Sequence, residues 1–62
     1  MKRKELVRLI EKQGCRLLRE GANHTLYFNP DNNKVSTIPR HTEIKDFLSK
    51  KICKDLGIDF KK

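Results

Sequence analysis

Apolar residues near the start of the chain recur at helical spacing. Leu6, Leu9 and Ile10 stand at positions i, i+3 and i+4, and charged residues occupy the opposite side. Gly14 follows them, and glycine readily adopts the left-handed conformation that ends a helix. This pattern predicts an amphipathic helix over residues 3–13.

Three segments in the middle of the chain have the composition and length of β-strands. Residues 15–20 are short and alternating, and residues 24–28 are rich in β-branched and aromatic side chains. Residues 34–38 form the third segment, which Pro39 ends because proline cannot donate a hydrogen bond to the sheet. The turn-forming sequence at residues 29–33 and the short connections favour an antiparallel meander.

The helical period returns over residues 44–56, and Gly57 is the expected stop. One stripe of this second helix consists of Ser49, Ile52, Cys53 and Leu56. The order of elements predicts an α+β fold, in which two helices cover one face of a three-stranded antiparallel sheet and the other face stays in contact with solvent.

The chain of 62 residues is expected to form one domain, residues 1–62, with a thin core. Leu26, Tyr27 and Phe28 could offer a stacking platform for single-stranded RNA, but alternate side chains of a strand point to opposite faces, so at least one alternate set must belong to the core. We expect Tyr27 to be buried and Phe28 to be partly exposed.

The composition narrows the classes of ligand. Fifteen Lys and Arg residues against eight Asp and Glu give a net charge of +7, which favours a polyanion as the partner. No apolar run approaches the roughly 18 residues of a membrane-spanning helix, so nucleic acid is favoured over a membrane. The N-terminal segment lacks the apolar stretch of a signal peptide, and we expect a cytoplasmic protein.

Several kinds of site lack their usual residues. Cys15 and Cys53 have no His or Cys at metal-ligand spacing, so we expect two buried or half-buried free thiols and no metal. The chain has no glycine-rich phosphate loop, no recognisable Ser/His/Asp set and no acidic cluster for Mg²⁺. We therefore expect no cofactor.

His24 and His41 remain as candidate catalytic residues. A neutral histidine, whose ordinary pKa is about 6.5, can take the proton of a ribose 2′-OH so that the 2′-oxygen attacks the adjacent phosphorus. His24 follows the small turn residues Gly21, Ala22 and Asn23, which let a ligand approach closely. A histidine on a half-exposed strand is nevertheless more often an ordinary surface residue.

Residues 39–42, Pro-Arg-His-Thr, stand just before the second predicted helix. A phosphate could dock at that helix N-terminus, or Thr42 could cap the helix while Arg40 is merely solvated. The lysines at positions 45, 50, 51 and 54 could follow an RNA backbone or form an ordinary solvated face. The residue types leave both alternatives open.

The order of these motifs resembles the HicA family of toxin–antitoxin ribonucleases. The resemblance rests on Gly14 after the first helix, on residues 21–24 and 29–31, and on the strand end at residues 35–41. Residues 52–58 are also similar to the last helix of that family, so the resemblance covers nearly the whole chain.

The resemblance implies a fold like that of a double-stranded-RNA-binding domain and the role of a type II toxin. Such toxins cleave mRNA without a metal through one histidine, which corresponds to His24, and a HicB antitoxin neutralises them. Many members read Gly-Ser-His-His at the turn, whereas here Ala22 and Asn23 precede a single histidine. The residues that we expect to contact RNA are Asn23, Arg40, His41, Lys45 and Lys34.

Two functions from different classes are therefore considered. The first is a metal-independent endoribonuclease (an mRNA interferase) with His24 as general base, mRNA as substrate and a HicB-like antitoxin as partner. The second is a non-catalytic basic module that binds RNA and releases no product. His24 and the family resemblance favour the first, and the general acid that protonates the leaving 5′-oxygen is open among His41, a lysine and water.

Overall fold

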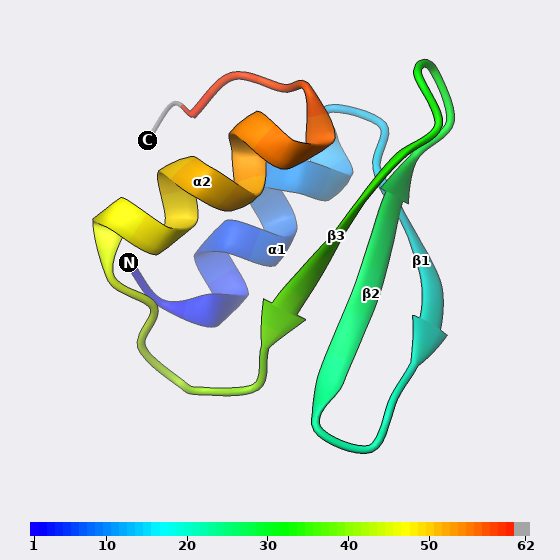
Figure 1. Ribbon diagram of the computed structural model, residues 1–62. Coiled ribbons are helices and arrows are strands. Elements are labelled where there is room, and N and C mark those ends of the chain that lie inside the picture. The colour runs from blue at the N-terminus through cyan, green and yellow to red at the C-terminus, as the bar shows by residue number, and fades with distance from the viewer. Residues whose placement is uncertain (61–62) are drawn as a thin grey trace.

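The order of elements in the structure is the one predicted. A computed structural model describes residues 1–60, and its elements are α1 (Arg3–Lys12), β1 (Arg16–Glu20), β2 (His24–Asn29), β3 (Lys34–Pro39) and α2 (Asp46–Leu56) (Figure 1). The strands form one antiparallel sheet in the order β1-β2-β3. The α+β fold predicted from the sequence is therefore confirmed.

Both helices pack on the same face of the sheet. The buried side chains of β2 are Thr25, Tyr27 and Asn29, which alternate with more exposed ones. From this face the Tyr27 hydroxyl donates to the Glu11 carboxylate of α1 at 2.8 Å, and the Asn29 amide donates to the Leu56 carbonyl of α2 at 2.9 Å. One face of β2 thus meets both helices, which lie on one side of the strands in Figure 1.

The core is small and joins the helices to the sheet. Its buried apolar residues are Leu6, Ile10, Cys15, Tyr27, Ile38, Ile44, Ile52, Cys53 and Leu56. Tyr27 is 6% exposed and Phe28 is partly buried, as predicted. Both cysteines are free and buried, and burial raises the pKa of each thiol.

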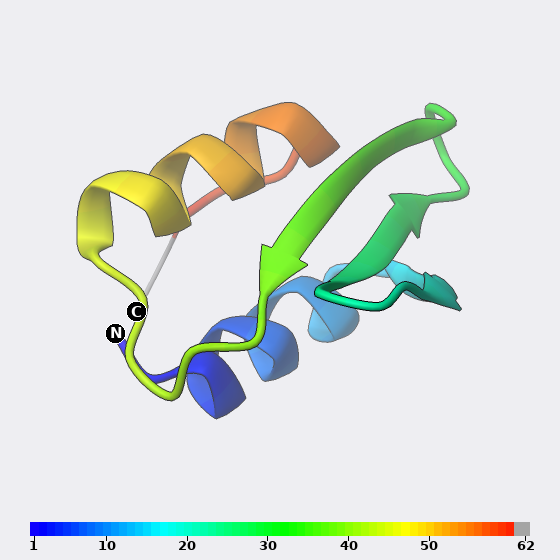
Figure 2. The same ribbon diagram turned by 60° about the horizontal axis from the view of Figure 1, so that its bottom comes forward.

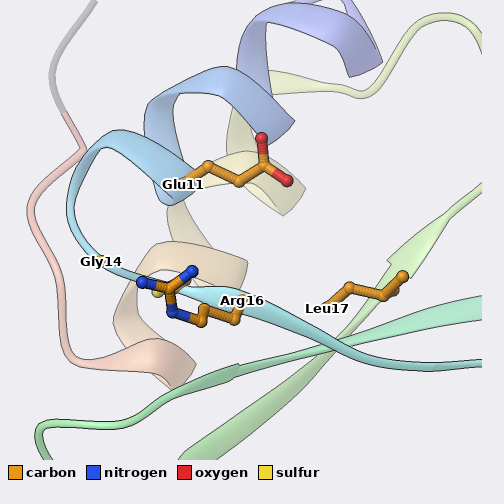
Figure 3. A pocket seen from close by; sticks show the side chains of 5 residues that line it. Glu11, Gly14, Arg16 and Leu17 are labelled. Carbon is orange, nitrogen blue, oxygen red and sulfur yellow. The ribbon is translucent and has the colours of Figure 1, made fainter.

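The edge strand β1 is the least covered part of the sheet. All five of its residues are exposed, and a bulge between Leu17 and Arg19 interrupts its pairing with β2. A shallow hollow opens between the end of α1 and the start of β1, and its lining is Glu11, Gly14, Cys15, Arg16 and Leu17 (Figure 3). It lies at the end of β1 opposite to Glu20.

The second helix begins later than predicted, at Asp46 instead of residue 44. The Ile44 N–H donates to the Met1 carbonyl at 2.8 Å, and the Met1 ammonium donates to the Ile44 carbonyl at 2.9 Å and to the Glu43 carboxylate at 2.8 Å. Figure 2 shows the N-terminus beside this segment. Because the N-terminus holds the backbone in an extended pairing here, the helix starts only after Lys45, its N-cap residue.

The packing of Tyr27 can be tested by titration, because it is the only tyrosine and the chain has no tryptophan. Burial and the hydrogen bond to Glu11 raise the pKa of Tyr27 from 10.0 to about 12. The unfolded chain releases this proton first, so the contribution to stability is complete below pH 10 and is lost as the pH rises toward 12. We expect tyrosinate absorbance in the folded protein to appear about two pH units higher than in urea. Coincident titration curves would contradict the burial of this hydroxyl.

Candidate active site

His24 lies at one end of the sheet and is exposed to solvent. It is the first residue of β2 and pairs with Pro39, the last residue of β3. The next residue, Thr25, is 2% exposed and belongs to the face that meets the helices. Because alternate side chains point to opposite faces, the His24 side chain belongs to the open face.

The open face carries apolar and basic side chains beside His24. Leu26 and Phe28 continue the row of His24 along β2 and are partly buried. Arg19 of β1 pairs with Leu26 and Arg16 pairs with Phe28, so both arginines belong to the same face by register. The solvent-facing platform predicted from the sequence is therefore present, and it carries two cations that the sequence analysis did not identify.

The turn before His24 is tight. The Gly21 N–H donates to the His24 carbonyl at 2.8 Å, which closes the turn over the exposed residues Ala22 and Asn23. A Cβ atom on Gly21 would lie 3.1 Å from the same carbonyl, which is closer than an ordinary contact. Glycine at this position therefore allows the close turn that brings His24 to the end of the sheet.

Arg40 extends from the segment after β3 to this turn. Its guanidinium donates to the carbonyls of Gly21 and Ala22, the second at 3.4 Å, and to the Glu20 carboxylate at 3.0 Å. Of the two alternatives left open for Arg40, the merely solvated side chain is wrong, because three groups of the turn and of β1 accept its hydrogen bonds. Only part of this cation is available to a ligand, since the Arg40 side chain is 43% exposed.

The other expectations for residues 39–42 also need correction. Thr42 does not cap α2, because the N-cap residue is Lys45 and the helix begins at Asp46. The Thr42 carbonyl instead accepts a hydrogen bond from the Arg3 N–H at 2.9 Å. Because α2 begins at Asp46 after its N-cap residue Lys45, the helix N-terminus at which a phosphate was expected to dock lies three residues beyond Thr42.

Three hydrogen-bonded side chains lie next to His24 on the helix side of the sheet, and they are Thr25, Glu20 and Arg3. Sequence reasoning missed all three. The Thr25 hydroxyl donates to the Glu20 carboxylate at 2.7 Å and accepts from the Arg3 guanidinium at 3.0 Å. The Thr25 hydrogen bond and the nearby Arg40 cation hold the pKa of the Glu20 carboxyl below its usual value. The hairpin register, in which Glu20 pairs with Thr25, is the signal that could have revealed this contact.

The residues expected to contact RNA do not all lie together. Those at the His24 end of the sheet or on the segment that follows β3 are Asn23, Arg40, His41 and Lys45. Lys34 begins β3 at the other end, where it pairs with Asn29, and a strand rise of about 3.3 Å per residue places it roughly 16 Å from the His24 position. Lys34 is exposed but is not part of the cluster around His24.

The chain matches a known protein family over most of its length. The match runs over residues 3–58, and the family is described as HicA toxin of bacterial toxin-antitoxin. The chain belongs to the HicA toxin family. No curated protein and no solved structure gave a significant match in the two other comparisons.

The family match gives this HicA protein the role of a toxin in a toxin–antitoxin system, with an antitoxin as its partner. The matched residues include all five elements of the fold and the whole group around His24. Within residues 1–60 no helix is long and apolar enough to cross a membrane. The same residues contain no group of three His, Cys, Asp or Glu side chains placed to hold a metal ion.

Proposed function

We propose that this toxin is a metal-independent endoribonuclease that cleaves mRNA with His24 as general base. The observation that carries the proposal is the position of His24, which is exposed at the end of an open sheet face beside a turn held by Arg40. A general base must come within hydrogen-bonding distance of the proton that it removes, so accessibility is its first requirement. The toxin role of the family agrees with an activity that damages RNA.

In the proposed reaction, the neutral imidazole of His24 accepts the proton of a ribose 2′-OH. The 2′-oxygen forms a bond to the adjacent phosphorus and the bond from phosphorus to the 5′-oxygen breaks. One fragment then ends in a 2′,3′-cyclic phosphate, and the other gains a proton and ends in a 5′-OH. The substrate supplies its own nucleophile, so the protein needs a base, an acid and cations for the phosphate charge.

The proposed path of the RNA follows the open face of the sheet. Arg19 and Arg16 would contact phosphates along β1, while Leu26 and Phe28 offer apolar contact to bases. Beyond His24, the RNA would contact Asn23, His41 and Lys45. A contact with Lys34 would require the RNA to extend along the whole length of β3. His41 is exposed and follows Arg40 directly, which keeps it a candidate for the general acid.

The end groups of the product test this proposal. We expect the purified toxin to cut an mRNA transcript into fragments with 2′,3′-cyclic phosphate and 5′-OH ends, in the presence of EDTA as well as in its absence. The matched control is an oligonucleotide of the same sequence with 2′-deoxyribose at the cleaved position. It should bind but resist cleavage, because it lacks the nucleophile.

Three outcomes would contradict the proposal. Binding without any product would favour a non-catalytic RNA-binding module, whose affinity falls with salt in proportion to the phosphates that it contacts. Cleavage of the 2′-deoxy control would exclude attack by the 2′-oxygen. Loss of cleavage in EDTA would exclude a mechanism without metal.

The antitoxin is proposed to be HicB-like and to cover the His24 end of the sheet. The net charge of +7 favours an acidic partner, and a partner that binds only the folded toxin also stabilises it. Added to the cleavage assay in slight excess, such an antitoxin should stop cleavage and raise the melting temperature of the toxin. Cleavage at the original rate by the complex would contradict a partner that blocks His24.

A further inference from the structure

Glu20 contacts residues on both sides of His24 in the chain. Its Oε1 atom accepts hydrogen bonds from the Thr25 hydroxyl at 2.7 Å and from the Arg40 guanidinium at 3.0 Å. Thr25 follows His24 in β2, and the same guanidinium holds the carbonyls of Gly21 and Ala22 in the turn before His24. One carboxylate therefore connects the residue after His24 to the turn before it.

A second arginine supports the group from the helix side of the sheet. Arg3 of α1 donates through Nη2 to the Thr25 hydroxyl at 3.0 Å and through Nε to the Pro39 carbonyl at 2.9 Å. Pro39 is the strand partner of His24. The backbone of His24 is thus held by the turn before it, by Thr25 after it and by Pro39 across the sheet.

We propose that Glu20 is a positioning residue for RNA cleavage, which fixes the backbone that carries His24 by bonding Thr25 and Arg40 together. This inference rests on the proposed role of His24 as general base. A base fixed in this way presents its imidazole in few orientations, and a displacement of about 1 Å at a reacting group can reduce a rate by about 100-fold. Glu20 acts through its neighbours and does not touch the substrate.

The charge of Glu20 separates this role from RNA binding. A carboxylate near the substrate repels phosphate groups, so its removal should strengthen RNA binding or leave it unchanged. The Thr25 hydrogen bond and Arg40 lower the pKa of Glu20, so the carboxyl is ionised at neutral pH. A residue that served to attract the phosphate groups of RNA would instead carry a positive charge.

Arg40 also holds the turn before His24, but this positioning role is harder to separate from RNA binding. Its guanidinium has donors in a planar fork and can bond the turn carbonyls and the Glu20 carboxylate at the same time. These bonds leave from two separate nitrogens, Nη1 and Nη2, whereas a lysine has only one nitrogen from which to donate. Because Arg40 could also contact phosphate, Glu20 is the residue whose substitution gives the cleaner answer.

The test compares single-turnover cleavage with affinity for the uncleavable 2′-deoxy oligonucleotide in three variants. Glu20→Ala should lower the cleavage rate by about 10- to 100-fold, with affinity unchanged or higher. Glu20→Gln keeps an oxygen that can accept from Thr25, so it should recover part of the rate. The control is Asp55→Asn, which removes an equal charge from the exposed Lys51–Asp55 pair of 3.2 Å on α2 and should cleave at the wild-type rate.

Hydrogen exchange gives a readout that does not depend on activity. The Gly21 amide bonds the His24 carbonyl, so its exchange reports directly on the turn. We expect this amide to exchange faster in Glu20→Ala and in Glu20→Gln than in wild type and Asp55→Asn. If Glu20→Ala does not fold by circular dichroism, the comparison is made on Glu20→Gln.

Each result decides the inference. Either a wild-type rate or unchanged Gly21 exchange in the folded Glu20 variants would overturn it, and so would an equal loss of rate in Asp55→Asn. If wild type cuts RNA, His24→Ala does not and Glu20→Ala cuts normally, the positioning role alone fails. If wild type and His24→Ala give the same result, the proposed function fails and the positioning role fails with it.

Discussion

His24→Ala should abolish RNA cleavage while the fold and RNA binding survive. General base catalysis by a positioned side chain contributes about 100- to 10,000-fold in rate, and the loss should lie in that range. The fold should survive because His24 is exposed at the end of β2 and the buried residue next to it, Thr25, is unchanged. The measurement is the single-turnover rate on a transcript, with circular dichroism as the control for folding.

A second substitution at the same position sharpens this prediction. His24→Gln retains a polar side chain that can hydrogen-bond RNA but cannot accept the proton at neutral pH. It should therefore bind the 2′-deoxy oligonucleotide with near wild-type affinity and be as inactive as His24→Ala. Cleavage by either variant at the wild-type rate would show that His24 is not the base, and the non-catalytic role would then be tested on the same samples.

Ile38→Ala should unfold much of the protein at room temperature. Ile38 is fully buried in the middle of the core, where β3 meets the helices. Truncation of a buried isoleucine to alanine costs about 2–5 kcal/mol, and a domain of this size rarely gains more than about 3–5 kcal/mol from its core. The free energy of unfolding, measured with urea, should fall to near zero.

The matched control lies on the same strand. Val35→Ala also removes an aliphatic side chain from β3, but Val35 is 46% exposed and faces away from the helices. Its cost should be less than about 1 kcal/mol. Equal losses of stability in the two variants would contradict the assignment of the buried face of β3. A stable Ile38→Ala variant would show that the core does not depend on this side chain.

The helices and strands were predictable because their signals are local. The spacing of Leu6 and Ile10, the stripe that ends at Leu56 and the alternation that buries Tyr27 each depend only on the period of a helix or strand. Gly14 and Gly57 end their helices with φ angles of 99° and 70°, which few other residues adopt. These features need no knowledge of the rest of the chain.

The start of α2 was not predictable, because a distant segment decides it. Residues 43 and 44 have no local signal against a helix. The hydrogen bonds that hold Ile44 extended come from Met1, which is 43 residues earlier in the chain. The error about Thr42 has the same origin, since the Thr42 carbonyl bonds Arg3 and not the first turn of α2. Tertiary contacts replaced the local capping preference here.

For the candidate site, the sequence by itself determined which residue types could take part in catalysis. It contains a histidine after a small turn, few other candidate catalytic residues and an excess of cations. It could not determine which charged residues support His24, because Glu20, Arg3 and Arg40 come from three separate segments and meet only in the folded sheet. The hairpin register set the contact between Glu20 and Thr25, and the packing of α1 brought Arg3 to it. Periodicity assigns a side chain to a face, whereas the partner of a polar group depends on which atoms lie within hydrogen-bonding distance after the chain has folded.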